Sequence, residues 1–342
     1  MSDGLVDVEA LTDWVGDGLP GAGTPFTAER MGQEQGIANA LFALRRAGER
    51  WVLRRPPAVK NHPTASNIAR EWRVLQALGG TDVPHARALL FCEDTEVIGA
   101  PFMISEFVDG FTPIGLLPPP FDAGGAVVRD LSFAYVDALV ALGAVDWRSR
   151  GLEGFGKPDG FLERQVSRWR TQLDGYRVRE FPDEELVCEW LESNRPESGA
   201  PAILHGDYSQ TNVMVAPDLP PRVAAIVDWD TCTIGDPLLD IGHLLSRWSD
   251  PSRPGFVAQA PRDVSGFPTH DELAAHYAER SGRDLSALAY YECLTDFKLA
   301  VIVEGTYARQ FHAGVPDSQN TMAEIPLRLF RHAADIARGE RG

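Results

Sequence analysis

The segments HGDYSQTN, residues 205–212, and IVDWD, residues 226–230, hold side chains whose types and spacing suit a specific chemistry. Asp207 lies five residues before Asn212, and Asp228 ends the next apolar run. Transfer of a phosphoryl group from a magnesium nucleotide needs one carboxylate to orient the attacking hydroxyl. It also needs an amide and a second carboxylate to hold the metal. The spacing therefore predicts phosphoryl transfer, with Asp207 as base and Asn212 and Asp228 as metal ligands.

The same residues have a simpler interpretation, because Asp and Asn often only stabilise turns. A lone HGD sequence would favour that interpretation. Here HGD is followed by an asparagine and then by an apolar strand that ends in Asp, and this longer pattern is much rarer. Magnesium prefers such hard oxygen ligands and completes its shell with water and phosphate. We therefore expect ATP and Mg²⁺ as cofactors.

Neighbouring polar residues are expected to support this loop. His205 can hold it through hydrogen bonds. Asp236, followed by Pro237 at the first helical position, can cap the next helix. Asp240 would then lie one turn further along and face back toward the HGD loop. Asp230 is a candidate further neighbour of the metal.

The N-terminal part of the chain supplies candidate residues for the nucleotide. The strand WVLRR, residues 51–55, places Val52 and Arg54 on one face, so Arg54 can reach phosphates below a ceiling that includes Val52. Glu71 lies on the buried face of a helix expected over residues 64–78, and it can pair with Arg54 as a fork. A surface arginine and a partly exposed glutamate are the alternative.

A glycine-containing loop precedes that strand. The sequence GQEQGIAN, residues 32–39, includes Gly36 and Asn39 and can cover phosphates with backbone N–H groups. Two spaced glycines also describe an ordinary turn, so this pattern is weak by itself. The strand PFMISEFV, residues 101–108, is followed by the Pro-rich segment 111–121, which is typical of a hinge.

The order of elements predicts an α+β fold with two lobes. Residues 1–107 read as strands with one main helix, which indicates a small N-terminal nucleotide-binding lobe. Residues 108–342 are mostly helical and would form the catalytic and substrate lobe. Two short strands within it, NVMV and VAAIV, are expected to form a hairpin. That hairpin would bring Asn212 and Asp228 side by side.

Charge and composition exclude several classes of protein. The formal net charge of −17 argues against a nucleic-acid partner, because phosphate contacts need clustered Lys and Arg. That charge would suit a cationic substrate such as an aminoglycoside or an amine, or it simply keeps the protein soluble. No run reaches the roughly 18 apolar residues of a membrane span. With no signal peptide and four cysteines that form no CxxC pair, we expect a cytoplasmic protein with reduced thiols and no zinc site.

The motifs resemble those of the aminoglycoside phosphotransferase and choline kinase family, which are small-molecule kinases with a two-lobed, protein-kinase-like fold. The resemblance rests on HGDYSQTN, IVDWD, GDPLLD, WVLRRPP and MISEFVDG, and it covers nearly the whole chain after about residue 25. It is nearest to the branch related to the kinase-like domain fused to some acyl-CoA dehydrogenases. The late segment YYECLTDFKLAVIVEGTYARQ is also similar to that branch.

This resemblance implies the same roles for the base and the two metal ligands. It places Arg54 where the family usually carries a phosphate-binding lysine, with Glu71 as its partner on the helix. Backbone groups of Ser105 and Phe107 would contact adenine. Arginine is a larger, planar donor than lysine, and the glycine loop has Ala38 and Asn39 where a Ser-Asn pair is common.

These departures leave alternatives to an active kinase that transfers phosphate from ATP to a small-molecule hydroxyl. One is a nucleotide-binding regulatory or interaction module without phosphotransfer, and another is a metal-dependent hydrolase that uses the aspartates. The acceptor is open among aminoglycosides, choline, sugars, homoserine and hydroxyacyl compounds, because fold does not select among them. Candidate residues for its pocket are Trp169, Trp229, Trp248, Tyr291 and Arg309, and core packing is an equal alternative for each of them. Arg164, Arg168 and Arg170 are candidate partners for a carboxylate or a CoA phosphate.

Overall fold

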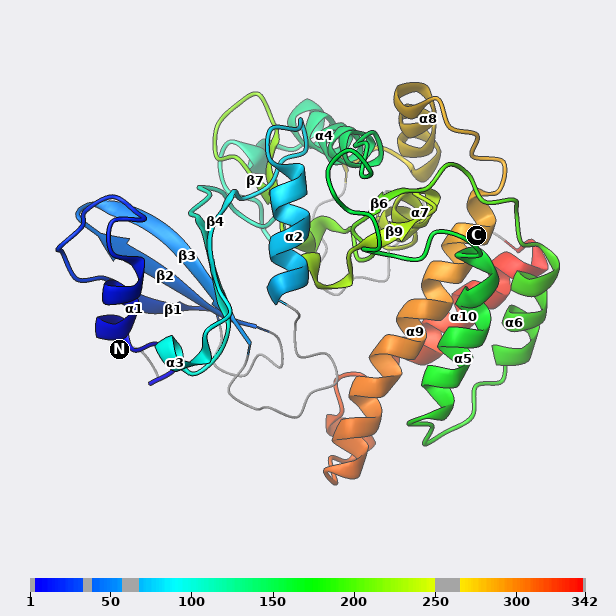
Figure 1. Ribbon diagram of the computed structural model, residues 1–342. Helices are drawn as coiled ribbons and strands as arrows, with labels where there is room; N and C mark the ends of the chain where they lie inside the picture. The colour runs from blue at the N-terminus through cyan, green and yellow to red at the C-terminus, as the bar shows by residue number, and fades with distance from the viewer. Residues whose placement is uncertain (1–3, 33–38, 57–67, 250–264, 341–342) are drawn as a thin grey trace.

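The computed structural model describes residues 4–32, 39–56, 68–249 and 265–340 (Figure 1). A strand-rich N-terminal part and a mainly helical C-terminal part lie side by side, with the helix α2 between them (Figure 1). The mixed α+β composition agrees with the sequence prediction. The boundary predicted between residues 107 and 108 stays a prediction.

The N-terminal part is built on a five-stranded antiparallel sheet with the order β1-β2-β3-β5-β4. A turn at Ala47 and Gly48, both with positive φ, joins β2 to β3 as a tight hairpin. The strand bounds are β1 Thr27–Met31, β2 Ala40–Arg46, β3 Glu49–Arg55, β4 Ala88–Cys92 and β5 Phe102–Glu106.

The two faces of this sheet bury different groups, because successive side chains of a strand alternate between faces. Leu53, Phe102 and Ile104 pack into a core beneath the helices α1 (Val8–Val15) and α3 (Thr95–Ile98). The alternate side chains of these strands point to the other face of the sheet, toward the rest of the molecule. Met103, between Phe102 and Ile104, belongs to the larger C-terminal core. The predicted alternation in WVLRR is present, since Leu53 is in the N-terminal core and its neighbours on the strand are not.

The helix α2 (Ile68–Leu78) lies between the sheet and the C-terminal part (Figure 1). Its apolar residues repeat at helical spacing and are buried in the larger core. Glu71 is buried on that same face, as the pattern predicted. The helix ends at Gly79 and Gly80, of which Gly80 has a positive φ. The predicted capping residues Thr64 and Ser66 lie outside the described residues.

The C-terminal part consists mainly of helices packed around the larger core (Figure 1). The predicted hairpin is present, and two further short strands form a second pair. The bounds are α4 Gly125–Gly143, α5 Gln165–Asp174, α6 Glu184–Ser193, β6 Ala202–Leu204, β7 Val213–Val215, β8 Val223–Ile226, β9 Thr233–Gly235, α7 Leu238–Ser246, α8 His270–Ser281, α9 Leu288–His312 and α10 Ile325–Arg338.

Two strand pairs position the motif loops. In the first, β7 pairs with β8 so that Val213 lies opposite Ile226, and the Val227 N–H donates to the Asn212 carbonyl at 2.9 Å. In the second, β6 pairs with β9. Because His205 directly follows β6, these pairs draw the HGD loop, Asn212 and the IVDWD segment together.

Two observations bear on the predicted class of protein. All four cysteines are buried and free of disulfides, as expected for reduced thiols. In the part of the chain that the structure describes, no helix has both the length and the apolar character needed to cross a membrane.

Candidate functional site

A cavity of about 430 Å³ lies between the N-terminal sheet and the β7–β8 hairpin. Its wall combines side chains from β3 and β5 with residues of α2 and with the end of the hairpin. The cavity brings together six of the residues predicted from the sequence to bind nucleotide or metal: Val52, Arg54, Glu71, Ser105, Phe107 and Asp228.

Arg54 is the centre of the charge network at one end of this cavity. Its Nε lies 2.7 Å from Glu71 Oε2, and its Nη2 lies 2.9 Å from Asp228 Oδ1 and 3.1 Å from Asp230 Oδ1. The Arg54 side chain is 12% exposed and that of Glu71 only 5%. The predicted Arg54–Glu71 pair is therefore present and buried, and the alternative of a surface arginine is wrong.

Opposing effects set the ionisation of this pair. Burial lowers the pKa of Arg54, but Glu71, Asp230 and Asp228 together raise it above its ordinary value. Burial raises the pKa of Glu71 to about 7, against the attraction of Arg54. The close Nε and Oε2 atoms make no hydrogen bond in the described part of the chain, so their attraction is Coulombic. Arg54 therefore stays charged, while Glu71 titrates near neutral pH.

The backbone at Asp228 is strained. It has φ 66° and ψ 67°, in the left-handed region that residues with a Cβ seldom adopt. Among the described residues, Ala47 is the only other non-glycine residue with a positive φ, and a hairpin turn explains it. Asp228 lines the cavity, and its side chain is 45% exposed. Such unexplained strain is characteristic of functional positions.

The predicted glycine loop is described only at its end. Asn39 Nδ2 donates to the carboxylate of Asp230, at 3.2 Å from Oδ2. This contact ties the end of the loop to the IVDWD segment. Gly36 lies outside the described residues, so its proposed contact with phosphates stays a prediction.

Asp207 has polar contacts to both of its carboxylate oxygens. Asn212 Nδ2 donates to Asp207 Oδ2 at 2.8 Å and to its backbone carbonyl at 2.8 Å. On the other oxygen, His243 Nε2 lies 2.9 Å from Oδ1 and Arg247 Nη1 donates to Oδ1 at 3.3 Å. Burial alone would raise the pKa of Asp207, but His243, Arg247 and Lys298 hold it well below its ordinary value. Asp207 is therefore ionised at neutral pH, as a base must be.

His243 contacts Asp207 as a neutral imidazole. Its side chain is 2% exposed, and burial lowers its pKa to about 4. Two groups lie beside its Nε2: Asp207 Oδ1 at 2.9 Å and Arg247 Nη1 at 3.1 Å. Within the described ranges, Nδ1 has no hydrogen-bond partner.

The HGD loop is fixed by buried hydrogen bonds of the kind expected from the sequence. The Asp240 carboxylate accepts the backbone N–H groups of His205 and Gly206 at 2.7 and 2.8 Å. His205 Nε2 lies 2.9 Å from the Val227 carbonyl, which links the loop to the end of β8. Lys298 donates to the Gly206 carbonyl. His205 and Asp240 therefore have the structural roles predicted for them.

Asp236 contacts the start of α7 but is not its N-cap, because the helix begins at Leu238 and its N-cap is Pro237. Its Oδ1 accepts the N–H of Leu238 at 3.1 Å at the start of α7, and its Oδ2 accepts from Tyr291 Oη at 2.8 Å. Tyr291 and Trp248 are each 1% exposed and pack in the core, so the core is the correct one of the two alternatives left open for them. Trp229 is likewise buried and lines the cavity of about 430 Å³.

A second cavity, of about 710 Å³, has Asp230 in its wall. Trp169, Arg164 and Arg168 line it, as the sequence suggested for an acceptor pocket. Arg170 instead pairs with Glu185 at 2.9 Å. Among the other predicted liners, Arg309 donates to Thr306 on its own helix.

Sequence reasoning missed three residues around Asp207: His243, Arg247 and Lys298. The first two were detectable, because they follow Asp240 at helical spacings of three and seven residues: His243 lies on α7 and Arg247 is its C-cap residue. Lys298 is distant in sequence on α9, and its proximity to the HGD loop depends on tertiary packing, which brings its Nζ to the Gly206 carbonyl.

Comparisons with known proteins agree with this geometry. Residues 33–276 match the model of the phosphotransferase enzyme family. Acyl-CoA dehydrogenase family member 11 of Homo sapiens is 32% identical over 283 residues, which cover 80% of this chain but 35% of that protein. The Gallus gallus protein of the same name is 31% identical over 80% of this chain. The chain thus spans about a third of the length of these relatives.

Solved structures show the same fold. A crystal structure from Ralstonia eutropha assigned to the aminoglycoside phosphotransferases has a TM-score of 0.82 at 29% identity, covering 98% of this chain and 99% of that one. An ethanolamine kinase of Plasmodium vivax has a TM-score of 0.59 at 12% identity, covering 92% of this chain and 83% of that one. The predicted two-lobed, protein-kinase-like fold is therefore confirmed. With a match over residues 33–276, the chain belongs to the phosphotransferase enzyme family.

Proposed function

We propose that this protein is an ATP-dependent small-molecule kinase that transfers the γ-phosphoryl group of Mg-ATP to a substrate hydroxyl. Asp207 is the base, and Asn212 and Asp228 hold the magnesium ion. The family shown above is one of phosphotransferases. The residue roles, the alcohol acceptor and a cytoplasmic location are part of the proposal.

The observation that supports this proposal most strongly is that hydrogen bonds connect the proposed base with the segments that carry both proposed metal ligands. Asn212 donates to the Asp207 carboxylate at 2.8 Å, and the Asn212 carbonyl accepts the N–H of Val227, the residue before Asp228. A turn-stabilising role would explain the first contact but not the strained, half-exposed carboxylate beside it.

The residues present fit a magnesium ion that is bound mainly through the nucleotide. Asn212 and Asp228 offer hard oxygen atoms, and Asp230 adds a further carboxylate nearby. Among the described residues, no group of three or more His, Cys, Asp or Glu side chains could hold a metal ion. Magnesium sites of kinases are commonly completed by phosphates and water. When bound, the ion would offset negative charge on the phosphates.

The nucleotide would occupy the cavity of about 430 Å³. Val52 and Met103 supply apolar contacts, and the backbone at Ser105 and Phe107 supplies hydrogen bonds for adenine. Arg54 lies beside Asp228 and would contact the phosphates, while Glu71 holds its guanidinium in place. Arginine suits this role because its planar fork binds phosphate oxygens in pairs.

Asp207 then acts on the acceptor. As an ionised carboxylate it accepts a hydrogen bond from the hydroxyl. It takes up the proton as the hydroxyl oxygen bonds to the γ-phosphorus and the bond from that phosphorus to the bridging oxygen of ADP breaks. Asn212, His243 and Arg247 keep the carboxylate in one orientation. Positioning of this kind supplies much of the rate enhancement in phosphoryl transfer.

Two structural neighbours are consistent with a small hydroxyl compound as acceptor. The ethanolamine kinase named above is one of them. The other is an aminoglycoside phosphotransferase, APH(4)-Ia, in a ternary complex with ADP and hygromycin B, with a TM-score of 0.57 at 15% identity. At such identities the likeness concerns the fold, so the acceptor of this chain must be found by experiment.

A metabolite library tests the proposal. The protein is incubated with Mg-ATP and hydroxyl compounds, and products heavier by one phosphoryl group are detected by mass spectrometry. A phosphorylated product with matching ADP release supports the kinase. ATP hydrolysis that is independent of any acceptor would favour the hydrolase. Binding of Mg-ATP without any product across the library would favour the non-catalytic module, which the atypical Arg54 makes the second candidate.

A further inference from the structure

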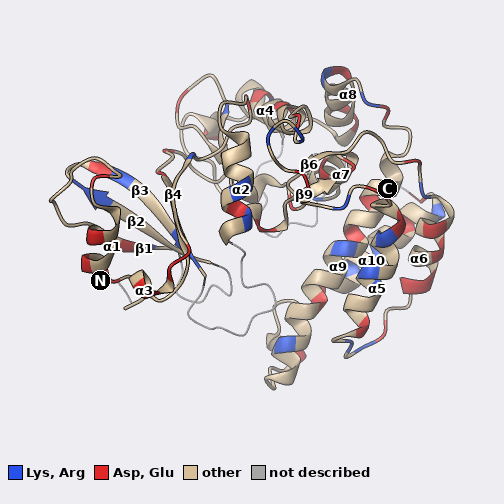
Figure 2. Ribbon diagram, viewed as in Figure 1, with Lys and Arg blue, Asp and Glu red and all other residues tan. Residues whose placement is uncertain are grey.

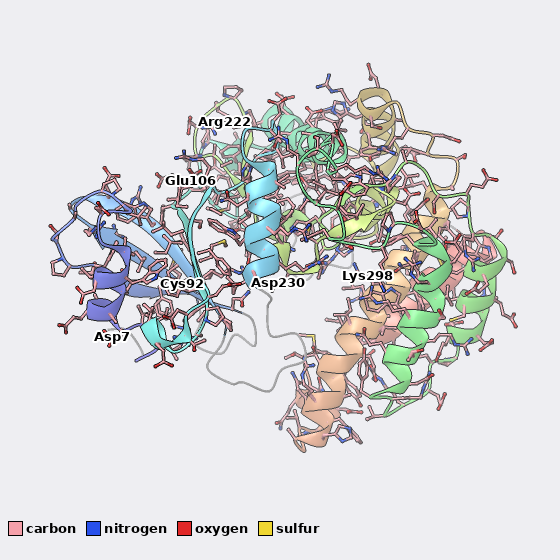
Figure 3. All side chains as sticks on the ribbon, in the orientation of Figure 1. Asp7, Cys92, Glu106, Arg222, Asp230 and Lys298 are labelled. Carbon is pink, nitrogen blue, oxygen red and sulfur yellow. The ribbon has the colours of Figure 1, made fainter. Side chains whose placement is uncertain are left out.

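The second cavity, of about 710 Å³, lies next to the proposed base. Gly206, the residue before Asp207, forms part of its wall, as do Asp230 and, from the helices α5 and α9, Trp169 and Lys298. Figure 3 shows Asp230 beside the N-terminal end of α2 and Lys298 on α9. A ligand in this cavity would therefore lie close to the HGD loop.

The wall of this cavity is basic, although the chain is acidic overall. The chain has 32 Lys and Arg residues against 49 Asp and Glu residues. The described lining residues include five cations and a single carboxylate, Asp230, which is already paired with Arg54 at 3.1 Å. Figure 2 shows basic positions on α2, α5 and α9, whereas acidic positions predominate on outer helices such as α6. The five cations are Arg70, Lys157, Arg164, Arg168 and Lys298.

Not all of these cations are equally available to a ligand. Arg70 donates to the Cys232 carbonyl at 2.9 Å, and Arg164 donates to backbone carbonyls of its own loop. In contrast, Lys157 and Arg168 are exposed and make no ion pair within the described ranges. Their charges are not offset by a neighbouring carboxylate in the structure, so they remain able to bind an anion.

Lys298 connects the cavity with the base. It is buried, its Nζ donates to the Gly206 carbonyl, and it lies 6.0 Å from the centre of the Trp169 ring. Burial lowers its pKa, against the attraction of Asp207 and Asp240. The rest of the wall is largely apolar and suits a hydrocarbon body; it includes Phe155, Phe161, Trp169, Leu204 and Ile302.

We propose that the acceptor is an anionic hydroxyl compound, with a carboxylate or phosphate group on an apolar body, and that Arg168 and Lys157 bind this group. The inference rests on the proposed kinase function for the reacting hydroxyl. It replaces the cationic acceptor suggested by the net charge. Exposed charges further apart than a Debye length of about 8 Å are largely screened, so the local wall outweighs the distant acidic surface.

Matched acceptors test the charge of the substrate. Wild-type protein is assayed with hydroxyoctanoates that carry the hydroxyl at successive carbons, each beside its neutral amide, and with glycerol phosphate beside glycerol. Choline is the cationic comparison. We expect the kcat/KM of each anion to be about tenfold or more above that of its neutral analogue, because loss of one charge-assisted hydrogen bond lowers kcat/KM by about that factor. The two anion series separate carboxylate from phosphate recognition. Equal rates, or a preference for amides or choline, would overturn the inference.

A matched pair of variants on α5 locates the contact. In Arg168→Gln the preference for the anion should fall about tenfold, while KM for ATP stays unchanged. In Arg170→Gln, which removes a charge two residues away that is paired with Glu185, the preference should persist. If the double variant Arg168→Gln, Lys157→Gln still prefers the anion as wild type does, the site is wrongly assigned.

Calorimetry separates failure of this inference from failure of the kinase. The same anions are titrated into wild-type protein, Arg168→Gln and Arg170→Gln without nucleotide. Binding that is lost only in Arg168→Gln, with no turnover of any compound, would keep the anion site and reject the kinase. Turnover of neutral or cationic compounds alone would keep the kinase and reject the anion site. If the anions neither bind nor are phosphorylated, the anion site is rejected as well.

Discussion

The substitution Arg54→Met should destabilise the protein by an amount that depends on pH. Arg54 has two different kinds of partner: Glu71 is 5% exposed, whereas Asp228 and Asp230 are 45% and 30% exposed. Partly exposed pairs contribute about 0–1 kcal/mol each. Breaking a buried pair costs about 3–5 kcal/mol, because one charge is left buried without compensation. The loss should therefore come mainly from Glu71.

Protonation of Glu71 limits that loss at low pH. Burial already raises its pKa to about 7 with Arg54 present, and removal of Arg54 raises it further. A carboxyl group whose folded pKa is raised favours the folded state below its unfolded pKa, and this stabilisation is lost as pH rises through the folded pKa. In Arg54→Met the free energy of unfolding therefore continues to fall above neutral pH, by up to about 1.4 kcal/mol per pH unit.

Urea unfolding of the two proteins near neutral pH and one unit to either side measures this effect. The difference between wild type and Arg54→Met should grow with pH, and adding Glu71→Gln should remove most of the pH dependence. Arg50→Gln is the matched control on β3, since its pair with Asp109 is 39% and 65% exposed and should contribute less than about 1 kcal/mol. A pH-independent loss, or no effect of Glu71→Gln, would refute the buried-pair reasoning.

Two further predictions concern the HGD loop. In Gly206→Ala the new Cβ would lie 2.6 Å from the Thr231 carbonyl oxygen at a φ of 82°, so we expect a loss of about 2 kcal/mol or more, measured by thermal unfolding; unchanged stability would contradict the described loop conformation. His243 has a pKa lowered to about 4 from an ordinary 6.5, so its contribution to stability is present above the unfolded pKa and is lost as pH falls through the folded one. As pH falls from 6.5 to about 4, the free energy of unfolding of wild type should fall by up to about 1.4 kcal/mol more per pH unit than that of His243→Gln. Parallel plots of unfolding free energy against pH for the two proteins would show that His243 is not buried as a neutral ring.

The sequence alone predicted the parts of the site that depend on local spacing. The alternation in WVLRR placed Val52 and Arg54 on one face because strand side chains alternate. Helical spacing placed Glu71 on a buried face, and the cost of burying a charge predicted that it has a partner. The hairpin between Asn212 and Asp228 also follows from local turn and strand patterns.

Contacts between distant segments were not predictable in the same way. The strands β6 and β9 are three residues each and too short to give a clear alternation. Lys298 reaches Gly206 across 92 positions of sequence, which no periodicity reveals. The net charge of −17 left a cationic acceptor and simple solubility as alternatives, because a sum over the whole surface says little about one cavity. The sequence also could not decide whether Tyr291 and Trp248 line a pocket or pack in the core, because large aromatic residues suit both places.

The most direct test of the proposed function is phosphoryl transfer by Asp207→Asn to an acceptor found in the library, measured together with Mg-ATP binding. The substitution keeps the size of the side chain but removes the carboxylate that takes up the proton. Asp218→Asn, at an exposed carboxylate in the hairpin turn, is the control. We predict that Asp207→Asn lowers kcat by about 10²–10⁴ and leaves the Kd for Mg-ATP nearly unchanged, while Asp218→Asn changes neither. Transfer by Asp207→Asn at the wild-type rate would contradict the assignment of the base and with it the proposed mechanism.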